Sequence, residues 1–203
     1  YDTYGISLAG HLVEQVSGLD FATYLRSELF VPLAMDRSGI AVPPGLRDDV
    51  AIGYGFAGEW EALPWEYMNT APASSVNSTA TDMARLAIML LEEGRFAGRQ
   101  VLSEESVRGM LSRQYTNDPD QPGYGFTFFE NDWNGVTTFG HAGSMSGFAA
   151  MLQLVPEHDL GIFIACNQES SAVIDPILAA LMEALFPDAR PAAPRERYAK
   201  PLD

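Results

Sequence analysis

Apolar residues recur every three to four positions in five stretches of the chain, which is the period of an amphipathic helix. These stretches cover residues 6–17, 21–31, 81–93, 104–111 and 173–186. Typical signals bound them, for example Thr79 before the third stretch and Gly94 after it. The pattern predicts helices with one buried face each, and in the first helix that face includes Leu8, Leu12 and Val16.

Beyond Gly123 the pattern changes to short runs of β-prone residues. They cover residues 124–130, 136–139, 147–155 and 160–166. Asn134-Gly135, between the first two runs, predicts a tight hairpin turn. The last two runs are almost continuously apolar, which is typical of strands covered on both faces of the sheet. Helices followed by an antiparallel sheet and a closing helix predict an α+β fold.

The length of 203 residues and a hydrophobic content of 47% fit one globular domain with a sizeable core. We expect this domain to span residues 1–186. Residues 187–203 contain several prolines and predict a tail or linker. The glycine- and proline-rich stretch 37–69 predicts loops with short extended pieces. Three of its aromatic residues either line a cleft or pack in the core, and the core is slightly favoured: Trp60, Trp65 and Tyr67.

Composition excludes several classes of function. The formal net charge is −15 and Lys200 is the only lysine, so the basic patch that nucleic-acid binding needs is missing. No apolar run reaches the length of a membrane span. Cys166 is the only cysteine, which excludes an internal disulfide but leaves the compartment open between cytoplasm and periplasm or secretion.

The residues that could carry chemistry stand together after a predicted strand, in residues 139–144. A titratable histidine, His141, precedes Ala142 and Gly143, whose small size lets a substrate carbonyl approach the peptide N–H groups. Taken alone, such a short motif is also compatible with an incidental histidine before a glycine turn.

Other chemistries fail on spacing. Gly143 to Gly147 would be a nucleophile elbow only if a serine replaced Met145. The three histidines are too scattered to predict a metal site, and no cofactor is expected. A hydrolase that pairs His141 with Ser144 or Ser146 has no orienting carboxylate nearby in the sequence and is a weak alternative.

Several segments, in order, resemble class C β-lactamases and penicillin-binding-protein-like serine hydrolases, a family that includes esterases and D-amino-acid peptidases. Residues 1–10 are similar to the segment that begins with the family's Y-x-N motif, and residues 78–85 to a helix start. Residues 140–148, with His141-Ala142-Gly143, resemble the third motif, [KH]-x-G. The resemblance covers the chain to about residue 186 and implies a β-lactamase/transpeptidase-like fold.

The chemistry that the resemblance implies is acyl transfer through the serine of an S-x-x-K motif. Tyr1 matches the tyrosine that, with the motif's lysine, moves the serine's proton. The backbone N–H of Ser144 matches one half of the oxyanion hole, and Ala142 and Gly143 line the substrate's path beside His141. The implied substrates are esters, β-lactams or D-amino-acid peptides.

The chain departs from the family pattern in two ways. It contains no S-x-x-K, and we expect that motif upstream of Tyr1 in a longer parent, so that this fragment alone is inactive. Thr3 stands where the family usually has asparagine, and a hydroxyl cannot replace the donor and acceptor of an amide. This slightly favours esters over β-lactams.

Two hypotheses from different classes remain. The first is a serine hydrolase whose nucleophile lies upstream, and the second is a non-catalytic binding module that keeps the fold. In either case we expect upstream strands and helices to complete the sheet, so that the isolated chain exposes an edge through which it could associate with itself.

Overall fold

The computed structural model describes residues 2–168, 170 and 172–190. Its helices fall close to the predicted ranges, apart from a one-turn helix that the sequence did not predict, α3. They are α1 (Thr3–Ser17), α2 (Phe21–Leu25), α3 (Ala71–Ser74), α4 (Ala80–Leu91), α5 (Glu104–Met110) and α6 (Ile174–Leu185). A π-helical turn, Arg26–Phe30, continues α2, and short 3-10 turns occupy Arg47–Asp49 and Pro156–His158.

The helix ends confirm the capping signals. The side chain of Thr79 accepts a hydrogen bond from the N–H of Asp82, and Ser103 accepts one from the N–H of Ser106. Gly18 has a φ of 73° and its N–H bonds to the carbonyl of Glu14, so the end of α1 uses the left-handed conformation that glycine adopts without strain.

The main sheet has four antiparallel strands in sequential order. They are β5 (Phe129–Trp133), β6 (Val136–Met145), β7 (Phe148–Val155) and β8 (Leu160–Cys166). The hairpin between β5 and β6 turns at Asn134-Gly135 as predicted, with positive φ at both residues. The predicted strand over 124–130 is wrong for most of its length, because β5 begins only at Phe129. Two small hairpins complete the strands: β1 (Tyr54–Phe56) with β2 (Trp60–Ala62), and β3 (Arg95–Phe96) with β4 (Arg99–Gln100).

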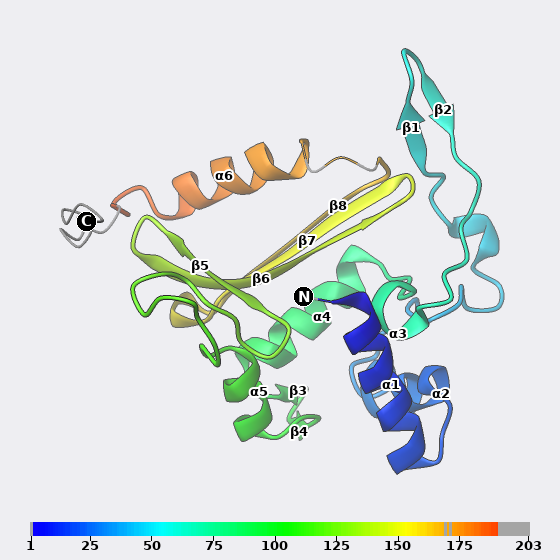
Figure 1. Cartoon of the computed structure of the whole chain (residues 1–203), viewed down its shortest axis with the longest axis horizontal. Coiled ribbons are helices and arrows are strands. Elements are labelled where there is room, and N and C mark those ends of the chain that lie inside the picture. Colours follow the sequence, from blue (N-terminus) through cyan, green and yellow to red (C-terminus); the bar gives the residue numbers. More distant parts are fainter. Residues whose placement is uncertain (1, 169, 171, 191–203) are drawn as a thin grey trace, which may run out of the picture.

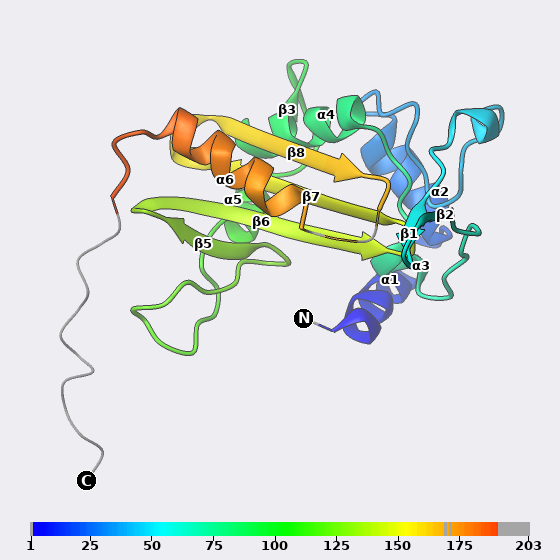
Figure 2. The ribbon, with the colours of Figure 1, turned by 90° about the horizontal axis from the view of Figure 1, so that it is seen from above.

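Helices cover both faces of the sheet, as the apolar strands predicted. Figures 1 and 2 show α6 on one face, and Figure 1 shows α4 and α5 on the other. The main hydrophobic core lies between α4 and the sheet, with Ala87 and Leu90 of α4 packed among Phe139, Leu152 and Leu154. The arrangement is α+β, in agreement with the predicted fold class.

The alternation of side chains along the strands decides which face each residue serves. Phe139 of β6 and Leu152 of β7 belong to the α4 core. His141 is paired with Leu152 in the β6–β7 register, so it shares that face. Ser144 lies an odd number of residues from His141 and belongs to the α6 face.

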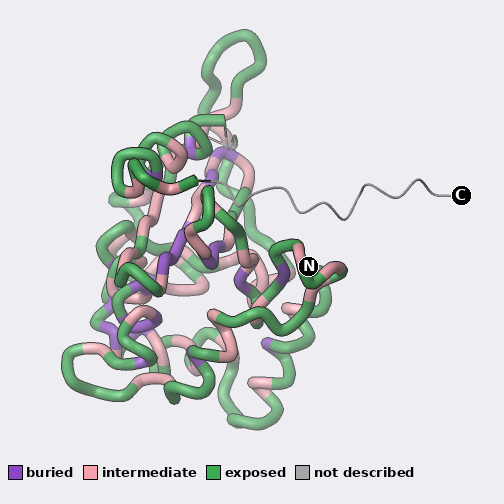
Figure 3. Tube along the Cα trace, turned by 90° about the vertical axis from the view of Figure 1, so that its left-hand side faces the viewer, coloured by how far each residue is buried: buried purple, intermediate pink, exposed green. Residues whose placement is uncertain are grey.

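Parts of the predicted burial are wrong. Leu8, Leu12 and Val16 of α1 are exposed by 47%, 57% and 89%, because the described chain packs only the opposite side of α1, where buried Gly10 meets Pro72. Three of the five aromatic residues of the 37–69 stretch are also exposed rather than in the core: Trp60, Trp65 and Tyr67. Figure 3 shows the hairpin of β1 and β2 as an exposed projection at the top of the molecule.

The outer edge of β8 has no strand partner within the described residues, so the expected open edge is present. Self-association through that edge remains a prediction. None of the described helices has the length and apolar composition that a membrane span requires. The boundary expected at residue 186 follows the end of α6 by one residue, and most of the predicted tail, from residue 191, lies outside the described residues.

Candidate functional site

One edge of β6 is open where the sequence places its candidate residues. The pairing with β5 ends at Gly140, opposite Phe129, while β6 itself continues to Met145. Residues 141–145 are paired with β7 on one edge. On the other edge, which β5 covers only up to Gly140, they have no strand partner within the described part of the chain. An open strand edge offers main-chain donors and acceptors to an extended ligand.

His141 is half-buried at the start of this edge. Its Nδ1 lies 2.7 Å from the main-chain carbonyl oxygen of Ala142. A carbonyl oxygen can only accept, so Nδ1 carries the proton of this hydrogen bond, and in the neutral ring the lone pair is on Nε2. The ring also packs against Phe129, with a centroid distance of 5.2 Å. Both contacts fix the orientation of the imidazole at the edge.

Gly143 leaves space beside His141. A Cβ atom built on Gly143 would meet nothing within 4 Å, whereas one on Gly140 would lie 2.7 Å from the side-chain oxygen of Gln153. Gly143 is two residues from His141, so both belong to the same face of the sheet. The open edge therefore has unfilled space beside it on the face of the sheet where the His141 side chain lies.

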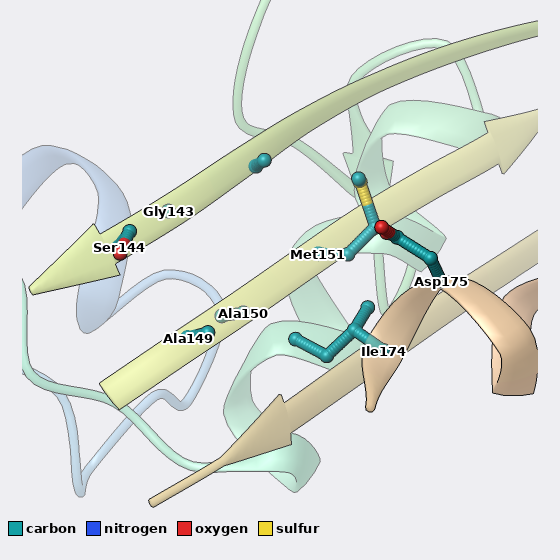
Figure 4. Close-up of a pocket in the computed structure, with 8 residues that line it drawn as sticks. Gly143, Ser144, Ala149, Ala150, Met151, Ile174 and Asp175 are labelled. Carbon is teal, nitrogen blue, oxygen red and sulfur yellow. The ribbon is translucent and has the colours of Figure 1, made fainter. Parts of the chain in front are cut away.

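A pocket of about 310 Å³ lies on the opposite face, between the sheet and the start of α6. Figure 4 shows Ser144 of β6, Met151 of β7 and Asp175 of α6 around it. Because Ser144 lines this pocket, its hydroxyl lies across the sheet from His141. The weak alternative of a Ser144 nucleophile activated by His141 therefore fails on geometry.

Thr3 stands on a different element from the other candidates, at the start of α1. Its carbonyl accepts a 2.8 Å hydrogen bond from the Ser7 hydroxyl, and Asp2 caps the helix through the N–H groups of Tyr4 and Gly5. Figure 1 shows α1 on the side of the sheet where α4 lies. No hydrogen bond joins Thr3 to β6 within the described residues. Tyr1 lies outside those residues, so its role stays a prediction.

An ion pair beside the site was missed in the sequence. Arg113, after α5, contacts the Glu130 carboxylate through Nε and also through Nη2, the latter at 2.9 Å. The hydrogen bond from Arg113 lowers the pKa of Glu130, and burial opposes it; the same bond raises the pKa of Arg113. The Gly123 N–H donates to the same carboxylate. No local signal in the sequence links residues seventeen positions apart in this way.

The described residues contain no group of three histidine, cysteine or carboxylate side chains arranged to hold a metal ion. The candidate residues that the structure brings together lie along one strand edge, His141 to Ser144. Phe129 and Glu130 of β5 lie next to this edge. Such an edge can bind an extended or carbonyl-containing ligand through its main chain.

Comparison with known proteins identifies the family. The Beta-lactamase family model matches residues 1–185, and the chain belongs to this β-lactamase and penicillin-binding-protein-like family of serine hydrolases. Penicillin-binding protein 4 of Amycolatopsis lactamdurans is 31% identical over 170 residues, which are 77% of this chain and 44% of that protein. Penicillin-binding protein 4* of Bacillus subtilis is 23% identical, over 100% of this chain and 48% of that protein.

Solved structures agree on the fold. An octameric penicillin-binding protein homologue from Pyrococcus abyssi superposes with a TM-score of 0.80 at 26% identity, covering 92% of this chain and 42% of its own. A penicillin-binding protein from Bacillus halodurans gives a TM-score of 0.70 at 26% identity, covering 92% of this chain and 56% of its own. The predicted fold is confirmed. The chain spans less than half the length of the two curated relatives named above.

Proposed function

We propose that this chain forms one wall of the acyl-transfer site of a serine hydrolase whose S-x-x-K motif lies upstream in a longer protein. The open β6 edge at residues 141–145 carries the proposal. It is the only place in the described chain where the family's third motif, an unpaired strand edge and unfilled space at Gly143 coincide. Membership of the family supports hydrolase chemistry in general.

In the proposed reaction the upstream serine attacks the substrate carbonyl, and its proton passes toward the leaving group through the motif's lysine and Tyr1. The bond from the carbonyl carbon to the leaving oxygen or nitrogen breaks, which leaves an acyl-serine that water hydrolyses. The N–H of Ser144 donates to the developing oxyanion, together with the N–H of the nucleophile. Ala142 and Gly143 let the substrate lie flat along the edge, and His141 contacts its polar end.

The proposed substrates are esters, β-lactams or D-amino-acid peptides, with a slight preference for esters. Thr3 is the reason for that preference, since its hydroxyl lacks the paired donor and acceptor of an asparagine amide. The alternative is a non-catalytic binding module. An S-x-x-K motif upstream of this chain in the longer protein would distinguish the serine hydrolase from this alternative.

The test is covalent labelling with a fluorophosphonate, read by intact mass. It uses the longer protein that carries this chain, with the 203-residue chain and a Ser144→Ala variant of the longer protein as controls. We expect one label on the longer protein and its Ser144→Ala variant, and none on the chain. Absence of label from the longer protein would favour the binding module, and a label on the chain itself would contradict the proposed position of the nucleophile.

A further inference from the structure

Three rings form a row that ends at the candidate site. The rings of Tyr124 and Phe129 are 5.2 Å apart in an edge-on arrangement, and Phe129 and His141 are also 5.2 Å apart. Tyr124 forms an antiparallel bridge with Phe129, so it continues the sheet beyond β5. Tyr124 remains 43% exposed. The row therefore presents aromatic surface from the edge of the sheet up to His141.

Tight backbone contacts hold the row in place. A Cβ atom on Gly123 would lie 2.2 Å from the carbonyl oxygen of Tyr115, and one on Gly125 would lie 2.1 Å from that of Met110. Glycine on both sides of Tyr124 therefore lets this segment pack closely against its neighbours. The backbone on both sides of Tyr124 is therefore closely packed, and an apolar surface that is already in place binds a ligand with little loss of conformational entropy.

Charge next to the row is compensated. The Glu130 carboxylate, adjacent to Phe129, is paired with Arg113 through two nitrogens and accepts the Gly123 N–H as well. A cationic ligand would therefore compete with Arg113 for this carboxylate. The rings favour an uncharged aromatic or apolar group.

We propose that Tyr124 and Phe129 bind an aromatic or long apolar group of the substrate, and that His141 lies where this apolar surface meets the β6 edge that receives the reacting carbonyl. This inference rests on the proposed function and extends it, because it names the class of substituent that the site selects. Both parts of the ligand then lie along one continuous surface, the rings followed by the main chain of residues 141–145.

The experiment measures binding to the 203-residue chain, so it needs no turnover. N-phenylacetylglycine methyl ester and N-acetylglycine methyl ester, which differ only by the phenyl group, are titrated separately and followed by two-dimensional amide NMR. We expect the phenylacetyl compound to bind about threefold to tenfold more tightly, in keeping with a ring contact. Tyr124→Ala should remove most of this preference, and Tyr124→Phe should keep it.

Two further variants make the result specific. Phe129→Leu keeps much of the packing volume and should also reduce the preference. Tyr67→Ala removes an 86% exposed tyrosine from the 37–69 stretch and should leave it unchanged. Equal or absent binding of the two compounds, or an equal loss in Tyr67→Ala, would overturn the inference. Labelling of the longer protein by fluorophosphonate is independent of these results, so the proposed function and the binding row can fail separately.

Discussion

Asp82, at the start of α4, is the acceptor at the centre of a buried polar network, and its removal gives the sharpest stability prediction. Only 1% of the residue is exposed. Its carboxylate accepts hydrogen bonds from the main-chain N–H of Arg37 at 2.9 Å and the hydroxyl of Ser38 at 2.8 Å. It also pairs with Arg85 at 2.7 Å. These contacts tie α4 to a segment more than forty residues earlier.

The expected cost of Asp82→Ala follows from what each donor does afterwards. A hydrogen bond to a charged group contributes about 1.5–3 kcal/mol. Arg85 is one-third exposed and regains water, and Ser38 keeps a 2.7 Å contact with Ser78, so these two losses are partial. The N–H of Arg37 loses its acceptor entirely. We therefore expect a loss of about 3 kcal/mol in the free energy of unfolding, and about half of that for Asp82→Asn.

The assay is urea unfolding of the chain, followed by circular dichroism. Asp49→Ala is the matched control, because it removes the Arg37–Asp49 ion pair, which has a similar distance of 2.7 Å but half-exposed partners. An exposed pair of this kind contributes less than about 1 kcal/mol. If Asp82→Ala costs no more than Asp49→Ala, the burial and connectivity of the network do not stabilise the fold as argued.

Three other predictions test the site and its sheet. Gly140→Ala should lower the free energy of unfolding by about 1–3 kcal/mol because its Cβ would collide with Gln153, whereas Gly143→Ala should leave the unfolding midpoint unchanged. Equal effects of the two variants would contradict the argument that only Gly143 has free space beside it. Gln153→Met should stabilise the chain by about 1 kcal/mol, since Nε2 of this buried residue has no hydrogen-bond partner in the described structure; a lower melting temperature would refute this. The pKa of Glu130 is lowered in the folded state, so its pair with Arg113 stabilises the fold above pH about 4.5, and this stabilisation is lost as the pH falls through the folded-state pKa. The difference in the free energy of unfolding between the wild-type chain and Glu130→Gln should therefore become smaller in acid. A difference that does not change with pH would count against the pair.

The sequence by itself determined the elements that depend on neighbours in the chain. The caps at Thr79 and Ser103, the stop at Gly18 and the turn at Asn134-Gly135 follow from hydrogen bonds and backbone angles within a few residues. The α+β order followed from the change of period after Gly123. Family resemblance also marked residues 141–144 as the candidate site, and that assignment stays a prediction.

Only the tertiary structure decided which surfaces those elements use. The period of α1 predicted a buried face, but burial depends on what packs there, and Leu8, Leu12 and Val16 are exposed in the described chain. Strand alternation shows what a side chain faces only once the strand and the layers that cover its two faces are known. For this reason only the structure showed that Ser144 lies on the α6 face of the sheet and His141 on the opposite face.

The same reason applies to two contacts that join distant segments of the chain. Arg113 and Glu130 are seventeen residues apart, and Asp82 and Ser38 are forty-four apart. The spacing of apolar residues does not predict such pairings, because they form when packing brings distant segments together. The local pattern therefore specified most of the helices and of the main strands, and long-range packing specified which surfaces they present.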